Sequence, residues 1–168
     1  MNPQTRPAAR VARWAGLVAG LFSGLFAGFL VAVLVLELSL RSFDRHVYTQ
    51  VRHVELDSLD KLAAVTLLPA LIATALLVGA RMFKAGERTP WSALTALVLL
   101  VGVLVLTLVV NMPVNSDQLD WTVQAPPADW ATVRDRWQIA HGVRTGAAVL
   151  AFGALIAHLA HVARSPRP

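Results

Sequence analysis

Residues 14–36 read WAGLVAGLFSGLFAGFLVAVLVL, a run of 23 residues without a single charged side chain. At ~1.5 Å per residue, a helix of this length can cross a hydrocarbon core of ~30 Å. The run is also longer than the apolar core of a cleavable signal peptide, which has roughly 7–15 residues. We therefore expect a permanent membrane-spanning helix here.

Three further apolar runs follow, and we expect spans at about residues 14–36, 62–80, 91–112 and 140–163. Composition agrees, because only 15% of the 168 residues are charged, 56% are hydrophobic and the mean hydropathy is +0.58. So little charge could not cover the surface of a soluble domain. The sequence predicts an all-α integral membrane four-helix bundle, a single domain over residues 1–168. Its extracytoplasmic segments, 37–61 and 113–139, should form a partly helical cap.

The basic residues indicate the orientation of the spans. Eight basic residues (among them Arg6, Lys84, Arg88 and Arg167) and one acid, Glu87, lie in the three short segments on the side of the termini. The other side carries seven basic and nine acidic residues. We expect both termini in the cytoplasm and the protein in the inner or plasma membrane. Interfacial tryptophans should form an inner belt of Trp14 and Trp91 and an outer belt of Trp121, Trp130 and Trp137.

Several classes of protein are excluded. The chain has no cysteine, which removes disulfides, thiolate metal sites and iron–sulfur clusters. The pI near 11 does not indicate a nucleic-acid partner, because the basic residues flank apolar runs and form no single patch. There is also no phosphate loop and no nucleotide-binding fingerprint. The main partner that the composition predicts is the lipid bilayer.

Local patterns predict how the helices pack and where they end. A strip of glycines in the first span should allow close helix packing and offers a surface for an oligomer: Gly16, Gly20, Gly24 and Gly28. Residues 41–61 lack Gly and Pro and should be helical. Pro126 and Pro127 end the preceding structure, Asp129 is a candidate N-cap, and one helix should run from Trp130 to about residue 163. Pro113 disfavours a helical conformation at the residue before it, so the third span should open there.

Polar residues gather at the outer end of the third and fourth spans, where they tend to mark function in a membrane protein. Asn111 and Asn115 would cap freed backbone groups or bind a ligand. The fourth span opens with residues that share one helix face by the 3.6-residue period: Trp137, His141, Arg144 and Thr145. Glu37 ends the first span on this side, where an arginine such as Arg144 could pair with it.

A metal site is an alternative reading of this end of the molecule. His46 and His53 lie seven residues apart and would share a helix face. With carboxylates and a third imidazole they would make a His/carboxylate site for iron, copper or zinc: Glu37, Glu55 and His141. The spacing matches no tight metal motif, which counts against a metal site. The site is kept as an alternative.

The motif Asn111-x-Pro113-x-Asn115, followed by Trp137-x-x-x-His141-x-x-Arg144-Thr145, resembles the anthrone oxygenase-like family of four-helix membrane proteins. The resemblance implies oxidation of a lipophilic phenolic or polyketide-like ketone by dioxygen, with no evident cofactor. It implies that His141 is the base, and that the enolate is stabilised by Arg144, Asn111 and Asn115. Substrate contacts would come from Trp137, Thr145, Trp121 and Glu37.

Two other functions stay open at this point. The first is a metal-dependent membrane oxidase that uses the His/Glu set with iron or copper. The second is a non-enzymatic accessory protein in which the polar cluster only locks helix ends together. A carrier is less supported, because four spans without an internal repeat make a poor alternating-access device.

Overall fold

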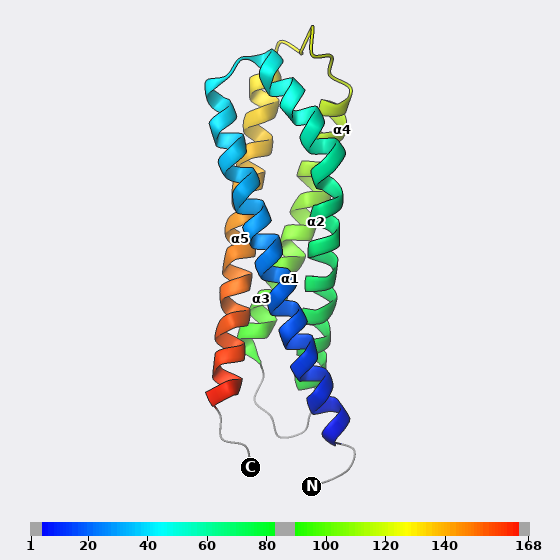
Figure 1. The fold of residues 1–168 in the computed structure, drawn as a ribbon, viewed down its shortest axis with the longest axis vertical. Helices are drawn as coiled ribbons and strands as arrows, with labels where there is room; N and C mark the ends of the chain where they lie inside the picture. Colours follow the sequence, from blue (N-terminus) through cyan, green and yellow to red (C-terminus); the bar gives the residue numbers. More distant parts are fainter. Residues whose placement is uncertain (1–4, 83–89, 165–168) are drawn as a thin grey trace.

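The computed structural model describes residues 5–82 and 90–164, which form an elongated bundle of long helices (Figure 1). Four of its helical stretches are long and apolar enough to cross a membrane. The protein is therefore an all-α, multi-pass membrane protein, as predicted. Its elements are α1 (Thr5–Ser39), η1 (Leu40–Ser42), α2 (Arg45–Met82), α3 (Trp91–Leu106), η2 (Thr107–Asn111), α4 (Met112–Leu119) and α5 (Trp130–Arg164).

The beginning of α1 and the end of α5 lie at the same end of the bundle, and η1 lies at the other end (Figure 1). This arrangement agrees with an even number of spans. Part of the charge pattern behind the orientation falls outside the described residues, namely Lys84, Glu87, Arg88, Arg167 and the side chain of Arg6. Which end faces the cytoplasm therefore stays a prediction.

Small residues bring α1 into close contact with its neighbours. The main core is rich in buried alanines, such as Ala19, Ala70 and Ala148, which let backbones approach where lipid gives no hydrophobic drive. A Cβ added at Gly24 would lie 2.9 Å from the ring of Phe152 on α5. Gly16 and Gly20 meet Leu159 of α5 in the same way.

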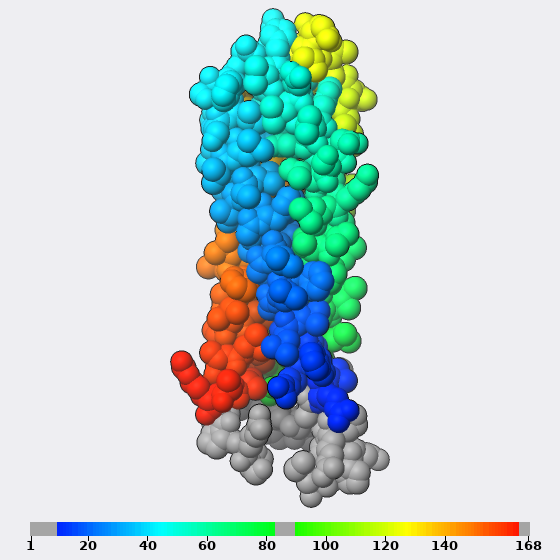
Figure 2. All heavy atoms as spheres, in the orientation of Figure 1, coloured from blue at the N-terminus to red at the C-terminus, as the bar shows by residue number. Residues whose placement is uncertain are grey.

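The glycine strip thus packs helices within the chain, as predicted. In Figure 2, α1 crosses the visible face between α2 and α5. Gly28, Gly142 and Gly146 have open space around them, with nothing within 4 Å of an added Cβ. An oligomer through this strip stays a prediction.

The helices α2 and α5 begin where the sequence favours a helix start. The Asp44 carboxylate accepts hydrogen bonds from the backbone N–H groups of His46 (2.8 Å) and Val47 (3.0 Å), which caps α2. These two bonds lower the pKa of Asp44 from its ordinary value. The helix expected in residues 41–61 is present from Arg45 onward and runs without a break past Pro69 into the second span. The last long helix begins at Trp130, where it was predicted to begin.

The prediction that the third span opens before Pro113 is wrong. Met112 is helical (φ −64°, ψ −45°), and α4 continues beyond the proline. The strain is absorbed one turn earlier, because residues 107–111 form a π-helix in which the Met112 N–H bonds the carbonyl oxygen of Thr107. A widened turn accommodates the missing N–H of Pro113 without ending the helix.

The tryptophans divide differently from the prediction. Trp14 and Trp91 are 62% and 71% exposed, and their place in an inner belt stays a prediction. Trp121 and Trp137 are buried, so the assignment of these two to an outer belt is wrong. Both are held inside the bundle by polar partners or apolar neighbours, and Trp137 belongs to the candidate site.

Candidate functional site

Arg52 is the centre of the polar cluster at the η1 end. It lies on α2 and is 2% exposed. Its guanidinium contacts Glu37 on α1 (3.0 Å) and Glu55 one turn along α2. It also donates to the side-chain oxygens of Gln118 (2.9 and 3.1 Å) and Asn115 (3.1 Å) on α4. One buried cation therefore joins three helices by charge-assisted hydrogen bonds.

Trp137 adds the fourth helix to this cluster. Its indole Nε1–H donates to the side-chain oxygen of Asn115 at 2.6 Å. The Arg52 guanidinium carbon lies 4.2 Å from the ring centroid, in cation–π contact. The imidazole of His141 stacks on the indole with centroids 4.7 Å apart and planes 8° apart. The four-residue spacing of Trp137 and His141 on α5 creates this stack.

The hydrogen bonds of His141 define its tautomer. Arg144 donates to Nδ1 through Nε (3.1 Å) and Nη2 (2.9 Å), and arginine has no acceptor. On the other side of the ring, Nε2 lies 3.0 Å from the carbonyl oxygen of Leu30, which can only accept. His141 is therefore neutral with its proton on Nε2, and its free lone pair is used to hold Arg144.

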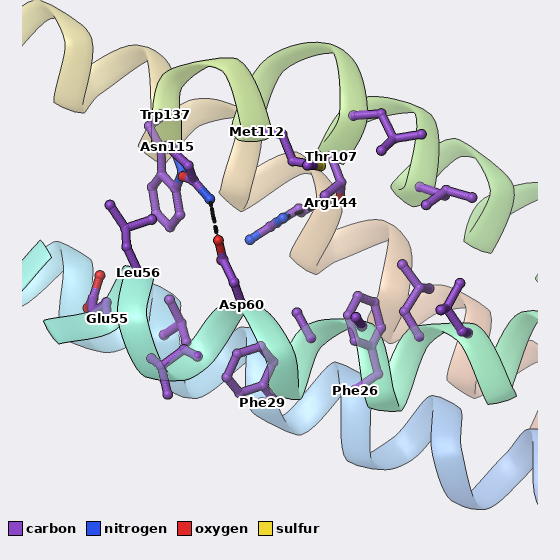
Figure 3. Close-up of a pocket in the computed structure, with 18 of the residues that line it drawn as sticks. Phe26, Phe29, Glu55, Leu56, Asp60, Thr107, Met112, Asn115, Trp137 and Arg144 are labelled. Atoms are coloured by element: carbon purple, nitrogen blue, oxygen red, sulfur yellow. Dashed lines mark hydrogen bonds between the residues drawn. The ribbon is translucent and has the colours of Figure 1, made fainter. Parts of the chain in front are cut away.

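A cavity of about 260 Å³ lies beside this cluster (Figure 3). Its volume is slightly below the ~300–1,000 Å³ usual for ligand pockets. Most of the wall is apolar and comes from α1, α2 and α3, with Phe26 and Phe29 among the larger side chains. Arg52 also lines the cavity. The other charged and polar lining residues lie toward one end in Figure 3: Glu55, Asp60, Thr107, Asn115 and Arg144.

Two residues on opposite walls define the polar end. Asp60 of α2 accepts hydrogen bonds from the Asn115 amide at 3.3 and 3.4 Å. Arg144 of α5 reaches across the cavity toward Asp60, and its Nη1 donates to the Thr107 hydroxyl at 3.2 Å (Figure 3). A carboxylate, a carboxamide and a guanidinium thus face the same space.

Trp137, predicted to contact the substrate, also lines the cavity, but the other predicted catalytic and substrate-binding residues do not. His141 is fully buried behind Arg144, and the Thr145 hydroxyl donates to the His141 carbonyl oxygen (2.7 Å). Trp121 packs with Tyr48 and Leu40 in a separate apolar cluster.

Glu37 and Asn111 also differ from their expected surroundings. Glu37 pairs with Arg52 instead of Arg144, because α2 presents Arg52 to the end of α1, and it also accepts from Gln138 (2.9 Å). Asn111 lies in the π-helix and is fully buried, and its amide atoms have no hydrogen-bond partner among the described residues. The expected capping by Asn111 and Asn115 is not found, because Asn115 bonds side chains and Asn111 makes no side-chain cap bond.

The candidate metal ligands are not gathered in one place. His46 contacts the carbonyl oxygen of Val123 (2.7 Å), and His53 that of Gln118 (3.1 Å). Glu37 and Glu55 share Arg52, as described above. Over residues 5–82 and 90–164, no three His, Cys, Asp or Glu side chains form a group that could hold a metal ion.

Arg52, Asp60, Gln118 and Thr107 were not singled out from the sequence. Arg52 and Asp60 stand among other charged residues in residues 41–61, a segment that was predicted to be helical but to lie outside the membrane. The helical repeat could have identified Arg52 and Asp60. Cavity-lining residues recur every three or four positions along one face of α2: Arg52, Leu56, Asp60, Ala63 and Leu67.

These features define a small multi-pass membrane protein with an internal cavity that is apolar along its walls and charged at one end. The family model for anthrone oxygenase matches residues 59–154, more than half of the chain. The chain belongs to this family, as its motifs predicted. No curated protein and no solved structure matches it.

The matched region contains much of the cavity wall but not the whole polar cluster. Asp60, Thr107, Asn115, Trp137 and Arg144 all fall inside residues 59–154. The buried triad of Glu37, Arg52 and Glu55 lies before the matched region. The family model therefore covers the charged and polar cavity residues from Asp60 onward, and Arg52 and Glu55 lie before it.

Proposed function

We propose that this protein is a membrane-embedded oxygenase that uses dioxygen to oxidise a lipophilic phenolic or polyketide-like ketone in the cavity beside Arg144. The observation that carries the proposal is the meeting of Asp60, Asn115 and Arg144 at the end of an apolar cavity, in a chain of the anthrone oxygenase family. Aromatic rings would be held by the apolar walls, with a substrate oxygen toward Arg144.

The first chemical step is removal of a proton from a CH₂ group that is conjugated with the substrate carbonyl. We assign the role of base to Asp60, because this carboxylate lines the cavity and, while ionised, can only accept a proton or a hydrogen bond. The negative charge then moves to the substrate oxygen, where Arg144 and Asn115 donate hydrogen bonds to it. A site that stabilises the enolate strongly can use a carboxylate as its base.

His141 has a positioning role in this mechanism. Its Nδ1 lone pair accepts from Arg144, and taking up a substrate proton there would break both hydrogen bonds. Its contact with Leu30 fixes the ring and so fixes the direction of the Arg144 guanidinium. His141 was predicted to be the base, and the geometry favours this supporting role.

The enolate is electron-rich enough to react with dioxygen. Transfer of an electron to O₂ and joining of the two radicals give a peroxide anion at the former CH₂ carbon, which takes the proton back from Asp60 and becomes a hydroperoxide. Loss of water then leaves a carbonyl, so that CH₂ and O₂ become C=O and H₂O. The chain supplies the base and the enolate stabilisation in a cavity whose wall is mostly apolar.

The test is turnover of a tricyclic anthrone by purified protein in lipid nanodiscs, followed by quinone absorbance and oxygen uptake. We expect Asp60→Asn to lower kcat by ~10²–10⁴-fold, the usual contribution of a general base. The matched control is Asp57→Asn, which removes an exposed carboxylate of α2 that does not line the cavity. Equal activity of the two variants would refute the role of Asp60, and inactive wild-type protein would refute the oxygenase.

Metal analysis of the same preparation tests the metal-dependent alternative. The proposed mechanism predicts that full turnover survives chelation with no iron or copper in proportion to protein. Near-stoichiometric metal, lost together with activity when His46 and His53 are replaced, would instead support the His/Glu oxidase.

The second candidate is a non-enzymatic accessory protein, which is favoured by the way Arg52 joins Glu37, Glu55, Asn115 and Trp137 from four helices. Such a cluster stabilises the bundle whether or not the cavity binds anything. An accessory protein would show unchanged thermal stability and no turnover when the anthrone is added.

We also propose the inner or plasma membrane as the location, with both termini cytoplasmic. The excess of basic over acidic residues on the side of the termini supports this orientation. Because the chain lacks cysteine, one thiol introduced at the exposed Ser58 tests it. A membrane-impermeant maleimide should label that thiol from outside the cell, and labelling only after lysis would reverse the topology.

A further inference from the structure

Part of the cavity wall reaches the outer surface of the bundle. On α2, Ala64 is exposed and Leu68 is 49% exposed, yet both line the cavity. On the facing side, Leu108 and Met112 are 52% and 50% exposed and line it too. A residue that lines a cavity and is half exposed marks a place where the wall opens to the outside.

Each rim of this opening consists of side chains that are four residues apart in the sequence. Asp60, Ala64 and Leu68 are four residues apart on α2. Leu104, Leu108 and Met112 have the same spacing on the facing span, where they belong to α3, η2 and α4 in turn. The first rim lies in the candidate span Arg45–Met82 and the second in the candidate span Trp91–Leu119, and apart from Asp60 the five rim side chains are apolar. A slit with apolar sides between two spanning helices opens toward lipid, not toward water.

We propose that this slit is a lateral entrance, through which a neutral, flat, lipophilic substrate passes from the bilayer into the cavity. The inference rests on the proposed function, because it names the route by which that substrate arrives. The Asp60 carboxylate at the polar end of the slit repels anionic headgroups and fatty acids, so it favours an uncharged molecule. Such a molecule dissolves in the bilayer and acquires its charge only beside Arg144, after proton removal.

Ala64 is the best position for a test, because its side chain is a small part of the rim. In this cysteine-free chain, Ala64→Cys gives a single thiol, and Val65→Cys gives a matched thiol on the adjacent, 62% exposed residue that does not line the cavity. Each thiol is labelled in nanodiscs with a bulky, lipophilic methanethiosulfonate reagent. Reduction removes the label again.

We expect the label at position 64 to lower kcat/KM by about ten-fold or more, and reduction to restore it. The same label at position 65 should change kcat/KM by less than about two-fold. Full activity with the bulky label at position 64 would overturn the entrance, since the substrate would then have another route.

A second measurement does not depend on turnover. Anthraquinone, a flat tricyclic probe, should slow labelling at position 64 and leave labelling at position 65 unchanged. If all variants are inactive but anthraquinone protects position 64, the entrance stands and the oxygenase reaction fails. Equal labelling rates with and without anthraquinone would overturn the entrance, and so would faster labelling at position 64 by a charged reagent than by a lipophilic one.

Discussion

Replacing Arg52 by glutamine should destabilise the bundle more than any other single change at the η1 end. Arg52 is 2% exposed, and the two carboxylates that it pairs with, Glu37 and Glu55, are 0% and 4% exposed. Arg52→Gln leaves both carboxylates buried with no adjacent cation. Breaking a buried ion pair by removing one partner costs ~3–5 kcal/mol.

The lower end of this range applies, because Gln138 still donates to Glu37 at 2.9 Å after the substitution. A loss of ~3 kcal/mol corresponds to a fall in Tm of roughly 6–12 °C for a chain of this length. The assay is loss of the 222 nm circular dichroism signal on heating in detergent, which reports all helices equally.

The matched control removes the two buried negative charges along with the cation. Adding Glu37→Gln and Glu55→Gln to Arg52→Gln leaves a neutral cluster, which should recover at least half of the lost stability. The reasoning is refuted if Arg52→Gln costs less than ~1 kcal/mol, the typical value for an exposed ion pair. It is also refuted if the neutral triple variant is no more stable than the single variant.

Three further outcomes are expected. His141→Gln should lower turnover by up to ~100-fold through misplacement of Arg144, with the pH dependence of the rate unchanged; loss of its acidic limb would make His141 the base. Gly24→Leu should cost ~1–3 kcal/mol by collision with Phe152, while Gly28→Leu, which meets open space, should be nearly neutral; equal effects would remove the packing role of the strip. Two backbone hydrogen bonds lower the pKa of Asp44, so its stabilisation is complete above the unfolded value of 3.8 and disappears as pH falls through the lowered value. Thermal stability of wild type and Asp44→Ala should therefore converge in strong acid, and a constant difference down to pH 2 would contradict this.

The spans and the start of α5 could be predicted because their signals are local. An uncharged run as long as residues 14–36 has few stable alternatives to a membrane helix, and Pro126 and Pro127 leave only a short link before Trp130. The group of Trp137, His141 and Arg144 was predicted correctly as one face, because it depends only on the helical repeat.

The rest of the site depends on contacts between distant residues. Arg52 meets Asn115 and Gln118 from 63 and 66 residues away, and local spacing carries no information on such pairs. Charged residues in a helix outside the apolar runs also read as solvated, although α2 turns Arg52 and Glu55 inward. The behaviour of Pro113 was missed because a proline can be accommodated by a wider turn upstream.

The π-helix at residues 107–111 determines which way the side chains of α4 point. A π-helix holds one residue more per turn than an α-helix needs, so every side chain beyond residues 107–111 is rotated by roughly 100° relative to an unbroken α-helix. Deleting one residue there would regularise the helix and swing Asn115 and Gln118 away from Arg52. The extra residue thus sets the rotation of α4, so that its polar side chains face the other three helices.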